Sequence, residues 1–225
     1  MLLIKDKESY DRNHELINQF SVIYNQAFPD ENEREELSAI YNRLCVQSKP
    51  FSFIIFDVQK GIVQGGLIID VYTEVEVAHL IYIVTDPEKR RQGIAKRLLK
   101  TYLPAALHEL DLDIETVIFE SNNPQLTLID SFDTNLRLDI FRRLGAKRIP
   151  INYIQPPLEG RTQRVDNLFL FVYTKQDYID TFRLEKFIGD FYRGLGVVDY
   201  EKNNDYIATI NSLKENSINN KIFLV

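Results

Sequence analysis

Residues 84–95 read VTDPEKRRQGIA and mark the point where strand-like patterning gives way to helix-like patterning. A helix start exposes main-chain N–H groups and a partial positive charge, so a tight turn there can wrap a phosphate. Gly93 and Ala95 leave room for a diphosphate against the backbone. Arg90, Arg91, Lys96 and Arg97 add cationic side chains nearby. The run therefore predicts a diphosphate-binding turn between a strand and a helix.

The spacing of this run excludes two common nucleotide sites, because neither G-x-x-x-x-G-K-[ST] nor G-x-G-x-x-G is present. Arg90-x-x-Gly93-x-Ala95, preceded by Asp86-Pro87-Glu88, resembles the coenzyme A pyrophosphate motif of the GNAT N-acetyltransferase superfamily. A solvated, basic helix start on an unrelated α/β protein is the alternative interpretation of the same residues.

The elements expected around the motif follow the order of that family. Apolar spacing predicts helices, short β-branched runs predict strands, and brief connections predict an antiparallel meander of three strands before the motif. The expected helices are 16–27, 30–45, 91–110, 138–144, 184–195 and 207–213, and the expected strands are 51–58, 62–72, 75–84, 114–120, 146–154 and 168–174. Because a helix separates the strands ending at Val84 and Glu120, these two strands are expected to lie parallel.

Three further stretches resemble a bacterial GNAT subgroup with an extended C-terminal region: 120–124 (ESNNP), 141–146 (FRRLGA) and 153–158 (YIQPPL). The resemblance implies an α/β (α+β) fold with a mixed central sheet flanked by helices. It places a GNAT acetyltransferase domain at 1–175 and a C-terminal helical extension, packed on the same domain, at 176–225.

The resemblance also implies an activity, namely transfer of an acetyl group from acetyl-CoA to a primary amine by direct attack in a ternary complex. The acceptor would be a small-molecule or peptide amine. The residues implied in coenzyme A binding are Ile83, Val84, Thr85, Arg90, Arg91, Gln92, Gly93, Ile94, Ala95 and Lys96. A longer acyl-CoA donor, or a non-catalytic acyl-CoA sensor or interaction module, is the alternative function.

Two side chains are candidates for handling the proton of the attacking amine. His79 lies 11 residues before Arg90, where some GNAT enzymes place a Glu or His base, and its ordinary pKa of about 6.5 suits that role. Packing within the sheet is the alternative role for His79. Glu120 could relay a proton or bind a cationic amine, or it could instead hold the turn that follows it.

The acid for the departing thiolate is less evident in this sequence. Many GNAT enzymes have a Tyr four residues before the Gly of the stretch that corresponds to 141–146 in this sequence. Here that Gly is Gly145 and the Tyr position is Phe141. Tyr153 or another tyrosine could substitute, or the thiol, with a pKa of about 8.5, could leave without help.

The composition is that of a soluble globular protein, with 44% hydrophobic and 27% charged residues in 225. A net charge of -6 provides no basic field for nucleic acid. No apolar run approaches the roughly 20 residues that span a bilayer, and the N-terminus turns polar too soon for a signal peptide. We therefore expect a cytoplasmic protein with no nucleic-acid or membrane partner.

The remaining chemistry-bearing residues have structural explanations. Cys45 is the only cysteine, so no intrachain disulfide is expected, and it continues an apolar helical stripe. His14 and His108 lack ligand-like spacing, so no metal site is expected. The aromatic stripe of Phe187, Phe191 and Tyr192 is expected to pack on the domain or to form a homodimer.

Overall fold

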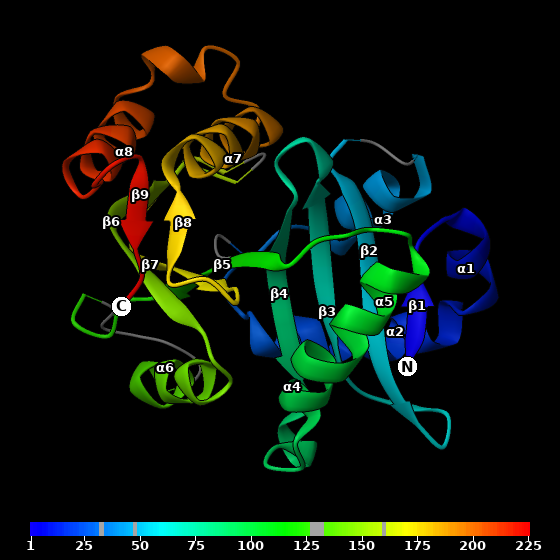
Figure 1. Cartoon of the computed structure of the whole chain (residues 1–225). Helices are drawn as coiled ribbons and strands as arrows, with labels where there is room; N and C mark the ends of the chain where they lie inside the picture. The colour runs from blue at the N-terminus through cyan, green and yellow to red at the C-terminus, as the bar shows by residue number, and fades with distance from the viewer. Residues whose placement is uncertain (32–33, 47–48, 127–132, 159–160) are drawn as a thin grey trace. The chain divides into compact units, whose positions relative to one another are not determined.

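The computed structural model of the 225-residue chain describes every residue except 32–33, 47–48, 127–132 and 159–160. Residues 32–33 of the expected helix 30–45 therefore lie outside the described residues. The chain divides into two compact units (Figure 1). Unit 1 comprises Met1–Val71 and Ala78–Ile114, and unit 2 comprises Tyr72–Val77 and Glu115–Val225.

Unit 1 contains a β-sheet with the strand order β1-β2-β3-β4. Its elements, some of which reach into unit 2 at Tyr72 and Val77, are β1 (Leu2–Ile4), α1 (Lys7–Arg12), α2 (His14–Ala27), α3 (Leu37–Val46), β2 (Phe51–Gln59), β3 (Ile62–Tyr72), β4 (Val77–Thr85), η3 (Pro87–Lys89), α4 (Ile94–Arg97), η4 (Leu98–Tyr102) and α5 (Leu103–Glu109). The predicted β2–β3 hairpin is confirmed, with Lys60 and Gly61 both at positive φ in its turn.

The core of unit 1 lies where α2 and α3 cover one face of this sheet. The register pairs Ile54 with Ile68 and Phe56 with Gly66, so alternate residues of β2 and β3 share that face. Cys45 packs against this core, as expected. The strand β1 and the helix α1, which had not been predicted, extend the unit at its N-terminus.

Two helix predictions in unit 1 are corrected by the structure. The helix expected at 30–45 starts later than predicted, because α3 begins at Leu37. Side chains bind the main chain before it: Arg34 donates to the carbonyl of Phe28 at 2.6 Å, and Tyr24 donates to the carbonyl of Glu35 at 3.0 Å. These bonds hold Arg34 and Glu35, which lie outside helices although the sequence predicted a helix over this range.

The helix expected at 91–110 begins at Ile94, and the helical run to Glu109 is interrupted by a π-helical turn, η4. Pro104 has no N–H to donate to the preceding turn, and the N–H of Leu103 reaches back to Leu98 instead. Because α4 begins at Ile94 and not at residue 91, the turn before it is longer than the sequence predicted.

Unit 2 contains a second set of strands in the order β5-β7-β6 and a separate antiparallel pair, β8 and β9. Its elements are η2 (Thr73–Val75), β5 (Thr116–Asn122), α6 (Thr134–Arg143), β6 (Lys147–Gln155), β7 (Val165–Tyr173), β8 (Tyr178–Asp180), α7 (Thr181–Gly194), η5 (Tyr200–Lys202), α8 (Asn204–Glu215) and β9 (Lys221–Phe223). The predicted strands and helices of this region are confirmed within a few residues at their ends.

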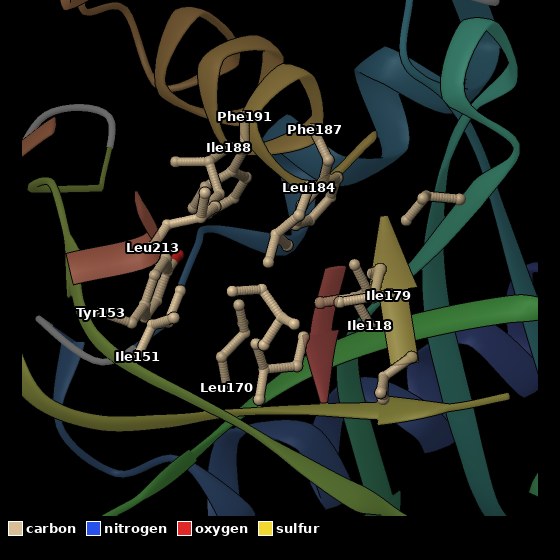
Figure 2. Close-up of a cluster of buried hydrophobic side chains, with 14 of the residues drawn as sticks. Ile118, Ile151, Tyr153, Leu170, Ile179, Leu184, Phe187, Ile188, Phe191 and Leu213 are labelled. Carbon is tan, nitrogen blue, oxygen red and sulfur yellow. The ribbon is translucent and has the colours of Figure 1, made fainter. Parts of the chain in front are cut away.

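The helix α7 covers one face of β5, β6 and β7 (Figure 2). Leu184, Phe187 and Ile188 are fully buried there against Ile118 and Leu170. The predicted aromatic stripe thus packs within its own unit, since Phe191 and Tyr192 belong to the same core. On the other face, Phe119 contacts Phe141 of α6 with ring centroids 4.7 Å apart.

The described residues contain no helix both long and apolar enough to cross a membrane. The parallel pairing expected between the strands ending at Val84 and Glu120 concerns strands of different units, and it stays a prediction.

Candidate active site

The turn between β4 and α4 presents the predicted binding residues. Residues 90–93 lie outside helices and strands and are exposed to solvent. The turn is anchored where it leaves the sheet, because the N–H of Asp86 donates to the carbonyl of Gln64 at 2.9 Å. The Asp86 carboxylate then accepts from the N–H of Glu88 at 2.9 Å and starts η3.

The backbone of this turn has a conformation that few residues adopt. Arg91 has φ 65° and Gly93 has φ 73°, so both lie in the left-handed region within three positions. The first intrahelical bond runs from the N–H of Arg97 to the carbonyl of Gly93 at 2.9 Å. The amides of Ile94, Ala95 and Lys96 precede that bond and have no intrahelical acceptor. The start of the helix can thus donate several main-chain hydrogen bonds to an anion.

The predicted binding residues differ in exposure. Ile83 and Thr85 are half-buried near the end of β4, while Val84 is buried between them. Ile94 is buried and anchors the helix, whereas Lys96 is exposed and available to a ligand. A Cβ at Gly93 would point into open space, with Arg97 Nη1 as its nearest neighbour at 3.8 Å. The place of a Gly93 side chain is therefore open to an approaching ligand.

Arg97, one of the cationic side chains expected near the anion, is engaged within the protein. Its Nε and Nη2 donate to Asp57 Oδ2 at 3.0 and 2.6 Å, and its Nη1 donates to the carbonyl of Gln92 at 2.8 Å. Each guanidinium nitrogen therefore has an acceptor in unit 1.

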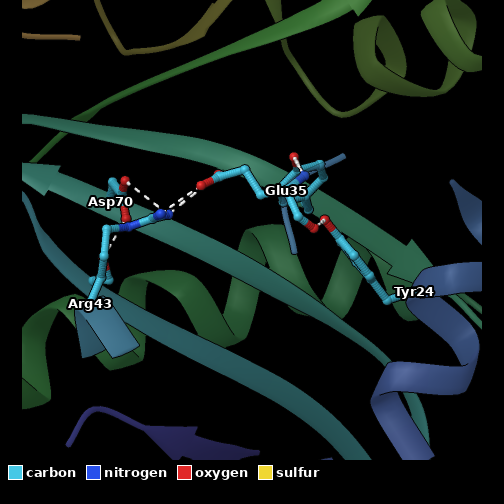
Figure 3. A network of polar contacts seen from close by, with 6 residues as sticks. Tyr24, Glu35, Arg43 and Asp70 are labelled. Atoms are coloured by element: carbon cyan, nitrogen blue, oxygen red, sulfur yellow. Dashed lines mark hydrogen bonds and ion pairs between the residues drawn. The ribbon is translucent and has the colours of Figure 1, made fainter. Parts of the chain in front are cut away.

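His79 is buried in β4, only 2% exposed, and belongs to a polar cluster on unit 1. Asp70 on β3 interacts electrostatically with His79, Arg43 and Glu35. Asp70 accepts a 2.5 Å hydrogen bond from Ser52, and Arg43 lies 3.9 Å from Asp70 and 2.5 Å from Glu35 (Figure 3). The imidazole thus lies buried in a charged environment within unit 1.

Burial dominates the ionisation of Asp70. Removal from water raises the pKa of this carboxyl above 3.8, although Arg43, the Ser52 hydrogen bond and His79 each act to lower it. Burial therefore disfavours the charged form of the Asp70 carboxyl.

In unit 2 the structure brings the other two catalytic candidates together. Tyr153 Oη donates to Glu120 Oε1 at 2.8 Å. The register explains the contact, because Glu120 pairs with Leu170 and Tyr153 pairs with Leu168 on the intervening strand β7. Leu168 and Leu170 point to the same face, so Glu120 and Tyr153 also share it.

Tyr153 holds its proton firmly. Burial raises its pKa well above 10, and the neighbouring Glu120 carboxylate raises it further. Tyr153 is only 2% exposed, and Phe141 is packed against Phe119 on the other face. The Tyr153 hydroxyl therefore stays protonated. As a hydrogen-bond donor, it orients the Glu120 carboxylate.

Sequence reasoning missed the residues that surround the candidates. Asp57 and Asp70 interrupt otherwise apolar strands, and a buried charge in such a position signals a partner elsewhere in the fold. Gly65 was also missed. A Cβ there would lie 2.5 Å from the carbonyl oxygen of Val84 and 3.1 Å from Ile94, so only glycine lets β3 approach the end of β4 this closely.

Comparison with known proteins agrees with the fold. The sequence matches the model of the acetyltransferase (GNAT) family over residues 14–129, just over half of the chain. No protein of curated function matches the sequence.

Solved structures with this fold include a protein described as a GNAT-family acetyltransferase from Bacteroides thetaiotaomicron, with a TM-score of 0.60 and 16% identity over 84% of this chain and 93% of that one. An aminoglycoside 6'-acetyltransferase type Ii gives a TM-score of 0.52 with 15% identity, covering 77% of this chain and 97% of that one. An aminoglycoside 6'-N-acetyltransferase complexed with coenzyme A gives 0.50 with 16% identity over the same shares. At these identities the likeness concerns the fold.

The chain is therefore an acyltransferase of α/β fold that uses an acyl-CoA donor. It belongs to the acetyltransferase (GNAT) family, which confirms the family and fold class predicted from residues 84–95.

Proposed function

We propose that this enzyme transfers an acetyl group from acetyl-CoA to a primary amine, by direct attack within a ternary complex. The turn between β4 and α4 carries the proposal: residues 90–93 are exposed, Arg91 and Gly93 are left-handed, and a helix start follows at once. In this proposal residues 90–96 bind the diphosphate, and the main chain of Ile83, Val84 and Thr85 holds the pantetheine arm.

His79 is the proposed base. An aliphatic amine is protonated near neutral pH and must lose a proton before it can attack a thioester carbonyl. Acetyl-CoA supplies that thioester. The amine nitrogen forms the new bond to the carbonyl carbon, the carbon–sulfur bond breaks, and the amine proton passes to His79, directly or through water. A main-chain N–H near residues 83–85 polarises the carbonyl.

Glu120 is proposed to bind the cationic acceptor or to relay its proton. The hydrogen bond from Tyr153 supports this role, because it holds one carboxylate oxygen in place. Tyr153 is proposed to act mainly through Glu120, since its raised pKa makes it a poor proton donor to a thiolate. The sulfur then leaves as a thiolate and takes its proton from water.

The acceptor is proposed to be a small-molecule or peptide amine in the cytoplasm, with a homodimer as the assembly to test. We also propose that residues 1–175 form the acetyltransferase domain and that 176–225 are an extension of it. The packing of α7 against β5, β6 and β7 supports the placement of that extension against the domain.

The test of the proposed turn replaces Gly93 by Trp. The indole would occupy the open space above the turn, so titration calorimetry should detect no coenzyme A binding by Gly93→Trp. The matched control is Gly61→Trp, because Gly61 is also left-handed, at φ 77°, and also faces open space. It carries the same backbone strain in the β2–β3 turn.

Unchanged coenzyme A affinity in Gly93→Trp would refute the proposed turn. Thiol release is then measured with wild-type protein, acetyl-CoA and a panel of amines. Release that depends on an amine supports N-acetyl transfer. Binding without release in any amine would instead favour an acyl-CoA sensor.

A further inference from the structure

Asp57 and Arg97 form an ion pair between the sheet of unit 1 and the helix that follows the turn. Asp57 is 1% exposed, and its Oδ2 accepts from Arg97 Nε at 3.0 Å and Nη2 at 2.6 Å. Among the described residues, Oδ1 of the same carboxylate is buried with no hydrogen-bond partner. A buried carboxylate is unfavourable without a counter-charge, so pairing with Asp57 fixes the position of the Arg97 guanidinium.

The same arginine holds the turn itself. Nη1 donates to the carbonyl of Gln92 at 2.8 Å, and the main-chain N–H of Arg97 donates to the carbonyl of Gly93 at 2.9 Å. One residue thus links β2 to two consecutive carbonyls of the turn. The N–H and C=O groups of a trans peptide point in opposite directions. Because the Gln92 and Gly93 carbonyls are directed toward Arg97, the N–H groups of Gly93 and Ile94 point away from it.

Close packing beside the ion pair strengthens this link. Asp57 lies opposite Gly65 in the β2–β3 register. The missing side chain of Gly65 admits the carbonyl of Val84 and the Ile94 side chain, at 2.5 and 3.1 Å from where a Cβ would stand. The end of β4 and the start of α4 are therefore held against the same part of the sheet.

The turn needs such support, because Arg91 is a non-glycine residue at φ 65°. Left-handed conformations of this kind persist only when their surroundings enforce them. We infer that Asp57 and Arg97 are positioning residues, which hold the Gln92–Gly93 turn in the conformation that directs its amides at the donor's diphosphate. The inference rests on the proposed function of that turn.

The inference is tested by titrating coenzyme A into Arg97→Gln and Asp57→Asn. Each variant loses a charge-assisted hydrogen bond, so the Kd for coenzyme A should rise about 10- to 100-fold. The KM for the donor should rise by a similar factor, while kcat at saturating donor stays near the wild-type value. Inhibition by pantetheine, which has no diphosphate, should be unchanged in both variants.

A double variant separates positioning from stability. Arg97→Gln alone leaves the Asp57 carboxylate buried without its partner, and adding Asp57→Asn removes that charge. The unfolding midpoint should then recover toward wild type, while coenzyme A affinity stays low. Recovery of both together would overturn the inference, because it would reduce the pair to a stabilising contact.

The matched control is Arg34→Gln. Arg34 lies in the same unit and donates to the carbonyl of Phe28 at 2.6 Å rather than to a carbonyl of the turn, so coenzyme A affinity should not change. Gly93→Trp is included in the same series. If it loses binding while Arg97→Gln binds as tightly as wild type, the inference fails and the turn stands. If Gly93→Trp also binds normally, both fail.

Discussion

Buried charges in unit 1 lie beside the residue proposed to act as the base. Replacing His79 by Gln keeps a polar side chain of similar size but removes the titrating imidazole. We expect turnover to fall roughly 100-fold or more at neutral pH, the usual contribution of a general base. Donor affinity should be almost unchanged, and steady-state kinetics from pH 6 to 10 would measure both.

The pH profile distinguishes a base from a packing residue. At high pH more of the amine acceptor is already neutral, so the loss caused by His79→Gln should shrink. A loss of the same size at every pH, accompanied by a lower unfolding midpoint, would assign His79 to the sheet interior alone.

Asp70 provides a prediction about stability. Because its pKa is raised in the folded state, the native protein binds more protons than the unfolded chain between pH 3.8 and that raised value. The contribution of Asp70 to stability is therefore fully present below pH 3.8 and is lost as the pH rises through the folded pKa. Asp70→Asn removes this dependence and keeps an acceptor for Ser52.

Urea unfolding of both proteins across this pH range measures the effect. The free energy of unfolding of wild type, relative to Asp70→Asn, should fall as the pH rises and then level off. A relative stability that rises with pH would show that Arg43 outweighs burial at this carboxyl.

At the scale of elements, α8 supplies hydrogen bonds to a strand that ends its sheet. β6 is the last strand in the order β5-β7-β6. The N–H of Asn152 donates to Ser212 Oγ at 2.8 Å, and the N–H of Ile154 donates to Thr209 Oγ1 at 3.2 Å. Side-chain hydroxyls of the helix thus occupy edge positions that another strand could otherwise pair with.

Ser212→Ala leaves the N–H of Asn152 without that acceptor beneath the helix. We expect the free energy of unfolding to fall by about 0.5–1.5 kcal/mol, the usual net contribution of a hydrogen bond, because this bond is only partly buried. Chemical denaturation measures the change. Ser217→Ala removes an exposed hydroxyl bond near the end of the same helix and should change stability by no more than about 0.5 kcal/mol. Equal effects in the two variants would contradict the edge role of α8.

Helix boundaries illustrate what local pattern misses at this scale. Apolar spacing predicted a helix from residue 91, but Arg91 and Gly93 are left-handed and α4 begins at Ile94. The spacing reports which face is buried and says little about where the first turn forms. That start depends on Arg97 reaching Asp57 on a strand far earlier in the chain.

At the scale of the whole molecule, most of the order of strands and helices and the turn between β4 and α4 could be predicted, because each depends on neighbours in sequence. The hairpin at Lys60-Gly61 and the run at residues 84–95 are local patterns of this kind. The family match over residues 14–129 confirms the class of enzyme that they indicated.

The sequence by itself determined most of the element order, the family and the place of the turn between β4 and α4, since propensity, turn chemistry and apolar spacing act over a few residues. Only the tertiary structure decided the partners of the charged side chains. Arg97 meets Asp57 across 40 positions and Tyr153 meets Glu120 across 33. Such pairs arise from strand register and from the free-energy cost of burying a charge without a partner. Neither can be predicted from a local sequence pattern.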